Sequence, residues 1–155
     1  MPKIRDYKAQ DHEDLIKMIS RVLEEFSMSI DKNGTDSELE HMAAVYGRDN
    51  AKFYVMEAGG RIIGSVGVRG IDKDTCELRK LYLLKEFRGL GLGRELLRHA
   101  LTFSVNKGYK KIQLEVSAKH EQAMRLYEKA GFVKTDEKPS CSRCEFTCEK
   151  KLPSE

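Results

Sequence analysis

The sequence predicts an α+β fold built on a mixed sheet, and three observations lead to that prediction. Segments that alternate apolar and polar residues interchange along the chain with segments whose apolar residues recur at helical spacing. The connections between them are short, and no internal repeat or low-complexity stretch occurs. A length of 155 residues suits one hydrophobic core. We therefore expect residues 1–155 to form a single domain.

The N-terminal third is predicted to hold one strand and two helices. Residues 3–7 alternate as a strand does. Asp11 can cap a helix with apolar residues at helical spacing, namely Leu15, Ile16, Ile19, Val22, Leu23 and Phe26. Ser37 and Glu40 have the spacing of a capping box, which predicts a second, short helix running to Tyr46.

Strands dominate the next segment. Residues 53–56 and 62–68 read as two strands around Ala58-Gly59-Gly60, a plausible hairpin turn, and residues 75–84 read as a third. The rest is predicted as a helix ending near Gly108, a strand over 112–116, a helix closed by Gly131, and strands at 132–133 and 145–152. The predicted order is β-α-α-β-β-β-α-β-α-β-β.

Composition and charge exclude several classes of protein. The chain has 28 Lys and Arg against 25 Asp and Glu, and its net charge of +3 is spread among both signs, so we expect no nucleic-acid partner. No apolar stretch approaches the roughly 18 residues of a membrane span. The N-terminus lacks the apolar run of a signal peptide, which predicts a cytoplasmic location.

The four cysteines do not form a recognised zinc pattern. Cys141 and Cys144 make a lone C-x-x-C, Cys148 follows closely, and Cys76 lies far upstream. Zinc sites commonly show a second pair at matched spacing or paired histidines, and the four histidines here are scattered. We expect reduced cysteines near a C-terminal strand and no bound metal, with a metal site as the alternative.

The most informative segment is the glycine-rich loop between the third of these strands and the next helix. Gly89, Gly91 and Gly93 stand at alternate positions just before that helix. Glycine lets the backbone turn sharply and approach a ligand, and the free amides of a helix N-terminus favour an anion. Arg88 and Arg94 add positive charge at the rim. The loop predicts a phosphate or pyrophosphate cradle, with a tight turn that binds nothing as the alternative.

The loop fits neither common nucleotide motif. A dinucleotide-binding fold has G-x-G-x-x-G after its first strand, whereas this loop follows about four strands. A P-loop needs Gly-Lys-Ser/Thr, which is absent.

These residues resemble the GCN5-related N-acetyltransferase (GNAT) superfamily. Its signature Arg/Gln-x-x-Gly-x-Gly/Ala is matched by Arg88, Gly91 and Gly93, and its A-x-x-L-Y-x-x-x-G-F motif by residues 123–132. The resemblance covers about residues 3–152. It implies a GNAT-like fold, with a central, mostly antiparallel sheet flanked by helices. A bulged fourth strand splays from the fifth in this fold and opens a slot for the cofactor.

The resemblance also implies a cofactor and its contacts. Acetyl-CoA would be the co-substrate, with its pantetheine arm paired to the backbone of the strand end and its pyrophosphate in the loop. The expected cofactor-binding residues are Leu81, Tyr82, Leu83, Arg88, Gly89, Leu90, Gly91, Leu92, Gly93, Arg94, His120 and Tyr127. His120 stands where the family often has asparagine, so its role as a cofactor contact is an open point.

Three residues are candidates for catalysis. By resemblance, Tyr127 would protonate the departing thiolate, while packing in a helix face is the alternative. The amine must lose a proton, and Glu115 and Glu77 match positions where some family members have acidic groups. A surface carboxylate or ion pair explains either glutamate equally, and His120 or a water chain could also serve as the base.

The acceptor is predicted only as a class. We expect a small-molecule or peptide amine, attacked directly in a ternary complex, so that Cys76 need not carry the acetyl group. Acidic residues between 24 and 40 could attract a cationic amine, or could simply form a solvated face. A non-catalytic acyl-CoA sensor is the alternative function, a nucleotide-binding domain is a second rival, and a homodimer is common in the family.

Overall fold

Seven strands form one mixed sheet in the order β1-β2-β3-β4-β5-β7-β6 in the computed structural model, which describes residues 1–154. The parallel β4–β5 pair is its only parallel pair within those residues. The strands are β1 Lys3–Asp6, β2 Lys52–Ala58, β3 Arg61–Gly70, β4 Thr75–Leu83, β5 Lys111–Val116, β6 Val133–Thr135 and β7 Phe146–Lys151. The predicted mixed sheet and the predicted order of strands and helices are confirmed.

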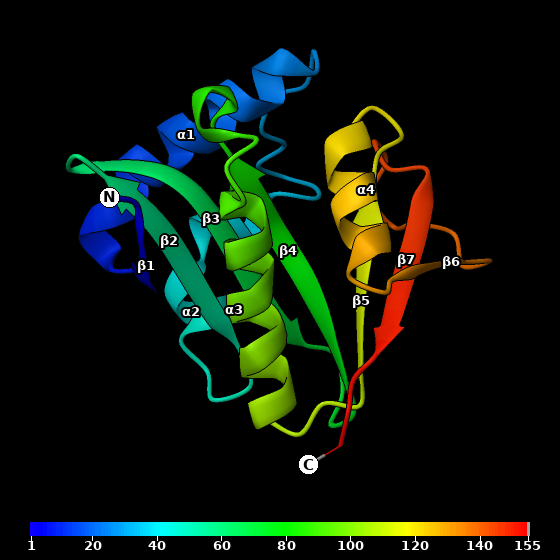
Figure 1. Ribbon diagram of the computed structural model, residues 1–155. Helices are drawn as coiled ribbons and strands as arrows, with labels where there is room; N and C mark the ends of the chain where they lie inside the picture. The colour runs from blue at the N-terminus through cyan, green and yellow to red at the C-terminus, as the bar shows by residue number, and fades with distance from the viewer. Residues whose placement is uncertain (155) are drawn as a thin grey trace.

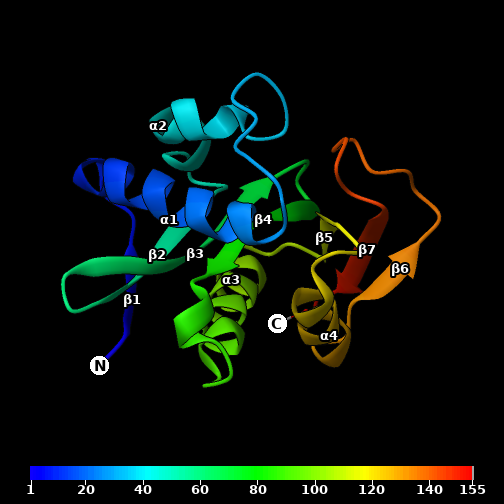
Figure 2. The ribbon, with the colours of Figure 1, turned by 90° about the horizontal axis from the view of Figure 1, so that it is seen from above.

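Helices cover both faces of the sheet (Figure 1). They are α1 His12–Glu25, α2 Met42–Tyr46, α3 Leu92–Asn106 and α4 Glu121–Lys129, with 3-10 turns at Ala9–Asp11, Ser37–Glu40 and Lys85–Phe87. Figure 2 shows α1 and α2 on one side of the sheet and α3 and α4 on the other. Since α1 and α3 both pack on β3, that strand lies at the centre of the core.

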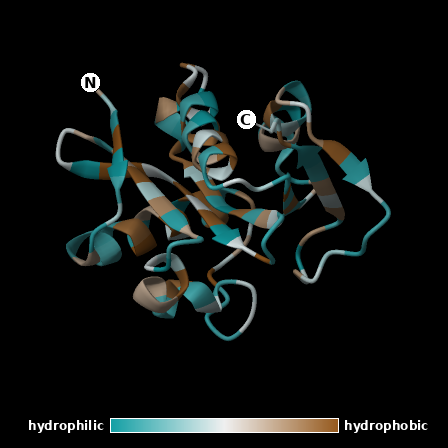
Figure 3. Ribbon diagram, turned by 90° about the horizontal axis from the view of Figure 1, so that it is seen from below, coloured by the Kyte–Doolittle hydropathy of each residue, from teal (hydrophilic) through white to brown (hydrophobic). Residues whose placement is uncertain are grey.

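The core forms because apolar residues recur on one side of each helix. Leu15, Ile19 and Leu23 of α1 are fully buried, as are Leu96 and Ala100 of α3. This spacing places the side chains on a single stripe that faces the sheet. Figure 3 shows both hydrophobic and hydrophilic segments on the long helices, as expected for helices with one face on the core.

The β2–β3 hairpin depends on two glycines. Gly59 and Gly60 have φ angles of +57° and +76°. A two-residue turn with positive φ at both positions matches the right-handed twist of the strands, and glycine adopts it without strain. The hairpin predicted around these residues is confirmed.

Strand β4 carries a bulge and then separates from β5. Gly67 pairs with Arg79 and Ser65 with Tyr82, so three steps along β4 match two along β3. Lys80 lies in this bulge with φ +56°, and the Ser65 hydroxyl donates a 2.7 Å hydrogen bond to its carbonyl oxygen. Pairing with β5 is confined to residues 75–77 and 111–113. The predicted splayed pair is therefore present, and it leaves one edge of β4 without a neighbouring strand.

Two helix starts differ from the sequence prediction. Asp11 stands at the N-cap of α1, but its carboxylate accepts hydrogen bonds from Arg5 and the Lys8 amide instead of capping the helix. Residues 37–46 do not form one helix, since a 3-10 turn at Ser37–Glu40 ends at His41 and α2 begins at Met42. Asp36 and Glu38, which lie just before or within this 3-10 turn, pair with the buried cations Lys80 and Arg79.

No helix within residues 1–154 combines the length and the apolar character needed to cross a membrane.

Candidate active site

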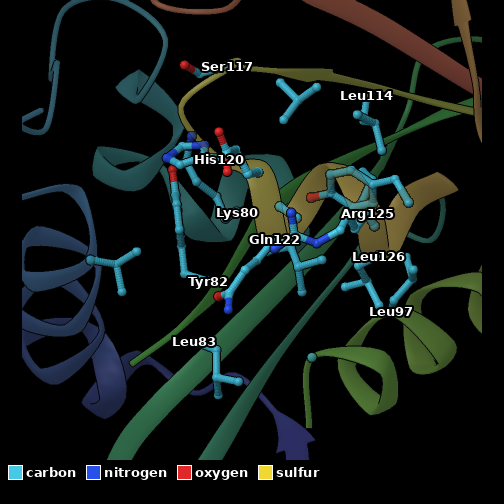
Figure 4. Close-up of a pocket in the computed structure, with 18 of the residues that line it drawn as sticks. Lys80, Tyr82, Leu83, Leu97, Leu114, Ser117, His120, Gln122, Arg125 and Leu126 are labelled. Atoms are coloured by element: carbon cyan, nitrogen blue, oxygen red, sulfur yellow. The ribbon is translucent and has the colours of Figure 1, made fainter. Parts of the chain in front are cut away.

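A cavity of about 930 Å³ lies where β4 and β5 separate. Its lining comes from both sides of the sheet, from the loop before α3 and the start of α4 on one side and from Thr35 and Arg143 on the other. Figure 4 shows Lys80, Tyr82 and His120 toward one end and Leu97 and Leu126 toward the other. One continuous cavity therefore has an end at the glycine-rich loop and a polar end across the sheet.

The loop end of the cavity is built to receive an anion. Gly91 is the N-cap of α3 and has φ +81°, and Gly89 has φ +82°. A side chain at Gly89 would meet no atom within 4 Å, and one at Gly91 would approach only Arg94 at 3.9 Å. The space above the loop is therefore open, and the first amides of α3 have no partner within the helix. These residues fit the pyrophosphate that the resemblance implies.

The two arginines at the loop have different surroundings. Arg88 donates from Nε and Nη2 to the Leu83 carbonyl oxygen at 3.0 and 2.8 Å, and it forms a two-pronged ion pair with Glu25 at 2.8 and 2.9 Å. Arg88 therefore fastens α1 to the end of β4. Arg94 lines the cavity and makes no ion pair within residues 1–154.

Most of the predicted cofactor residues line this cavity. Leu81, Tyr82, Leu83, Arg88, Gly89, Gly91, Gly93, Arg94, His120 and Tyr127 do so. Leu90 and Leu92 do not: Leu90 is 70% exposed, and Leu92 packs against the core. The side chains of Leu90 and Leu92 therefore do not contact the cavity, although their backbone belongs to the glycine-rich loop.

Tyr127 lies on α4 and lines the cavity. Its ring packs edge-on against Phe132, with 5.7 Å between the ring centroids. Burial raises the pKa of the phenol well above its ordinary value. The hydroxyl therefore keeps its proton at neutral pH and has it available for donation.

His120 stands at the N-cap of α4, edge-on to Phe26 with 4.4 Å between the ring centroids. Its Nε2 atom is buried and has no hydrogen-bond partner within residues 1–154. Burial lowers the pKa of the imidazole, as do the charges of Arg143 and Arg88, while Glu145 and Glu25 act in the opposite direction. The ring is therefore neutral at pH 7.

The two candidate glutamates have different surroundings. Glu77 does not line the cavity, because it pairs with Arg69 at 2.9 Å and approaches Arg79 at 3.7 Å. Glu115 does line the cavity, but both its oxygens accept hydrogen bonds from Ser140 and one accepts from the Cys141 amide, at 2.9–3.1 Å. Glu115 therefore anchors the loop between β6 and β7.

The cysteines lie near the predicted C-terminal strand. Cys148 is on β7, Cys141 and Cys144 are in the preceding loop, and all four cysteines are free thiols.

A cluster of buried charges forms the polar end of the cavity. Asp36 is fully buried and pairs with Lys80 at 2.8 Å and with Arg143 at 2.9 Å. Glu38 is also buried, and it pairs with Arg79 and, at 3.2 Å, with Lys80. The β4 bulge makes this possible, because it brings the adjacent Arg79 and Lys80 to the same carboxylate, whereas neighbours in a regular strand point to opposite faces.

Comparison with known proteins identifies the family. The model of the acetyltransferase (GNAT) family matches residues 17–132. This chain belongs to the GNAT acetyltransferase family. It is accordingly an acetyl-CoA-dependent N-acetyltransferase, and the resemblance inferred from the loop and the Leu126-Tyr127 motif is confirmed.

The similarity to individual proteins extends over nearly the whole chain. This acetyltransferase is 32% identical over 146 residues to the uncharacterized N-acetyltransferase YjgM of Escherichia coli, covering 91% of this chain and 87% of that protein. A GNAT-family acetyltransferase from Staphylococcus aureus Mu50 has the same fold, with a TM-score of 0.92, 22% identity and coverage of 99% and 100%. The PaiA N-acetyltransferase of Thermoplasma acidophilum, solved in complex with coenzyme A, has a TM-score of 0.78 at 22% identity, covering 98% of this chain and 99% of that one.

The charge cluster of this acetyltransferase was not predicted from the sequence. Asp36 and Glu38 belong to the acidic residues between 24 and 40 that were expected to attract a cationic amine or to form a solvated face, and both interpretations are wrong for these two residues. Their carboxylates are buried against cations. The only signal in the sequence was the Arg79-Lys80 pair inside a strand whose remaining residues are mostly apolar.

Glu38→Ala is expected to destabilise the fold by about 3–5 kcal/mol, because it leaves Arg79 and Lys80 buried without this partner. Burial alone would raise the pKa of Glu38, but the charges of Lys80 and Arg79 outweigh it and lower the pKa. The stabilisation is therefore present at neutral pH and is lost as the pH falls below the ordinary glutamate range. Urea unfolding at pH 7 measures the effect.

Glu13→Ala is the matched control, since Glu13 is 84% exposed and, among residues 1–154, forms an ion pair only with Lys17 one helical turn away. We expect it to change the free energy of unfolding by less than about 0.5 kcal/mol. Equal effects for the two variants would show that the buried cluster does not stabilise the fold.

Proposed function

We propose that this acetyltransferase transfers the acetyl group of acetyl-CoA to a primary amine, by direct attack in a ternary complex. The observation that carries the proposal is the single cavity, which joins the anion-binding loop to a polar end on the other side of the sheet. Bound acetyl-CoA supplies an activated acetyl thioester. Because both substrates fit in one cavity, no covalent acetyl-enzyme is needed, and Cys76 is buried away from the lining.

The cofactor is held by backbone groups more than by side chains. The edge of β4 at Leu81–Leu83 has no partner strand beyond residue 77 and can pair with the amide groups of the pantetheine arm. The amides from Gly89 to Arg94 and the positive end of the α3 dipole bind the pyrophosphate, and Arg94 adds charge. Arg88 contributes indirectly by holding the Leu83 carbonyl in place.

Tyr127 is the proposed general acid. Its phenol stays protonated at neutral pH and lines the cavity, so it can donate a proton to the departing thiolate of coenzyme A.

His120 is the proposed general base. It lines the cavity, its Nε2 atom lacks a partner within residues 1–154, and its neutral form can accept a proton from the attacking amine. Glu115 and Glu77 are weaker candidates, because Glu115 is engaged with the β6–β7 loop and Glu77 lies outside the cavity lining.

His120→Gln is expected to lower kcat by about 10²–10⁴-fold while leaving acetyl-CoA affinity nearly unchanged. Because the pKa of His120 is lowered, wild-type kcat should hold from neutral pH to below the ordinary value of about 6.5 and then fall as the imidazole becomes protonated. Steady-state rates at saturating substrates between pH 5 and 8 test this. An unchanged acidic limb in the variant would assign that limb to another group.

The proposed function is tested by binding and turnover together. Acetyl-CoA, ATP and NAD compete in a titration, and acceptors spanning polyamines, amino acids, aminoglycosides and N-terminal peptides are screened by release of free thiol. We expect preference for acetyl-CoA and amine-dependent release. Acetyl-CoA binding without turnover on any amine would instead favour a sensor, and preference for ATP or NAD would refute the proposal.

A further inference from the structure

The polar end of the cavity presents cations, while the acids that balance them lie behind. Arg79, Lys80 and Arg143 line the cavity, whereas Asp36 and Glu38 do not. The acids are also less exposed than the outermost cation: the side chains of Asp36 and Glu38 are 0% and 2% exposed, whereas that of Arg143 is 21% exposed. The Asp36 and Glu38 carboxylates are therefore shielded from a ligand, and Glu115, which also lines the cavity, is engaged with Ser140 and Cys141.

Two of the three cations have few donors left. The Lys80 ammonium is within hydrogen-bond reach of the Asp36 carboxylate at 2.8 Å, Glu38 at 3.2 Å and the Thr35 carbonyl at 3.4 Å, which accounts for its three hydrogens. Arg79 binds Glu38 and the Thr35 carbonyl, approaches Glu77 at 3.7 Å, and is only 11% exposed. These side chains support the site without facing a ligand.

Arg143, in the loop between β6 and β7, uses one edge of its guanidinium to bind Asp36. Nη1 donates to the Ser29 carbonyl oxygen at 3.1 Å and pairs with Asp36 Oδ2 at 2.9 Å, while Nη2 donates to Asp36 Oδ1 at 3.0 Å. These partners leave Nε and the second Nη2 hydrogen, and the Tyr82 hydroxyl is a further hydrogen-bond partner of the guanidinium. These two N–H groups lie side by side on the planar guanidinium, at the spacing that binds both oxygens of a carboxylate.

A second cavity of about 450 Å³ leads to the same arginine. Ser117, Lys119 and Arg143 line both cavities, so they form the shared wall. Lys119 is exposed and adds another cation there, while Asp31 and Glu145 also line the second cavity and Glu145 accepts hydrogen bonds from Ser117 and the Ala118 amide. Tyr82 also lines the main cavity, where burial raises the pKa of its phenol to about 12 while the charge of Arg143 and a hydrogen bond with its guanidinium lower that pKa. A neutral Tyr82 can donate to the same anion.

We propose that Arg143 determines acceptor specificity by binding a carboxylate, so that the preferred acceptors are amino-acid-like primary amines. This inference rests on the proposed amine acetylation. A carboxylate can bind the Nε and Nη2 hydrogens of Arg143 that Asp36 and Ser29 leave, whereas a polyamine or other polycation would bring further positive charge beside Arg143 and Lys119. Of the acidic residues between 24 and 40 that suggested a cationic acceptor, Asp36 and Glu38 are engaged with buried cations and Glu25 is paired with Arg88, so these three do not offset this repulsion.

The test compares acceptors that differ only in the carboxylate. A panel of L-amino acids is assayed with acetyl-CoA by thiol release, and each active member is paired with its decarboxylated amine and its carboxamide. We expect kcat/KM to be about tenfold to hundredfold higher for the carboxylate in each set, as for the loss of a charge-assisted, two-pronged hydrogen bond. Decarboxylated amines that react equally well or better would overturn the proposal.

Variants of Arg143 assign the preference to this residue. In Arg143→Gln the ratio of kcat/KM between carboxylate and decarboxylated amine is expected to approach one, with acetyl-CoA affinity unchanged. Arg143→Lys keeps a positive charge opposite Asp36, so the fold should be retained. It lacks the paired N–H groups of a guanidinium and should therefore lose most of the preference for the carboxylate acceptor. Arg98→Gln, an exposed change on α3, is the control and should keep the wild-type ratio. A preference retained in both Arg143 variants would exclude Arg143 as its source.

A binding measurement separates this inference from the proposed function. If the wild type acetylates no amine, the proposed function fails, but saturation-transfer NMR of N-acetyl amino acids and matched N-acetyl amines in the presence of coenzyme A still reports on Arg143. Selective binding of the carboxylates that is lost in Arg143→Gln would support the carboxylate site. Equal binding of the two classes would overturn it.

Discussion

Gly91→Val is expected to raise the dissociation constant for acetyl-CoA by more than about 100-fold, because the loss of two hydrogen bonds to a charged pyrophosphate corresponds to about 3–6 kcal/mol. Gly91 lines the cavity at the N-cap of α3 with φ +81°, and the space above it is open. A branched side chain there would occupy the volume of the pyrophosphate and force the backbone from the conformation that aims its amides at the ligand. Calorimetric titration of acetyl-CoA measures the change.

Gly108→Val is a matched control for backbone strain. Gly108 has φ +86°, and a side chain there would also meet no atom within 4 Å, but this glycine follows the opposite end of α3. Both variants should lose a similar free energy of unfolding, about 1–3 kcal/mol for a branched residue held at positive φ. Only Gly91→Val should lose its affinity for acetyl-CoA. If Gly108→Val weakens acetyl-CoA binding as much, the cradle is not the site of the effect.

These glycines also show what a sequence can predict. The hairpin at Gly59-Gly60 and the helix start at Gly91 are local, since a few neighbouring residues fix the backbone angles and the ligand geometry follows from them. The splayed β4–β5 pair was expected from the family resemblance, because the loop and the motif at residues 123–132 together select one fold. Neither inference required knowledge of which distant residues touch.

The charge cluster at the polar end of the cavity could not be predicted, because its contacts are not local. Asp36, Lys80 and Arg143 meet only after the connection before α2, the β4 bulge and the β6–β7 loop have come together. Glu115 stands between Leu114 and Val116, so alternation along a strand places it on the opposite face from them, but residue spacing cannot show that Ser140 and Cys141 bind its oxygens. Residue spacing reveals which face a side chain occupies, whereas its partners depend on tertiary structure.

Tyr127→Phe is expected to lower kcat by about 10²–10⁴-fold while changing the acetyl-CoA dissociation constant less than about threefold, the range typical of losing a general acid. Phenylalanine keeps the edge-on contact with Phe132 and fills the same buried volume, so the fold should be retained. Only the proton donor is removed. Single-turnover rates with acetyl-CoA and a saturating amine measure the loss.

Tyr109→Phe supplies the control, because Tyr109 is also buried and its hydroxyl donates to the Asn50 carbonyl at 2.7 Å, outside the cavity lining. We expect it to affect stability and leave kcat unchanged. If Tyr127 is the general acid, its importance should depend on the leaving group. A thiolate from a more acidic thiol needs less protonation as it leaves, so the loss of kcat in Tyr127→Phe should be smaller with an acetyl thioester of such a thiol. A deficit that stays constant would mean that Tyr127 only packs or orients, and the proton would have to come from another group.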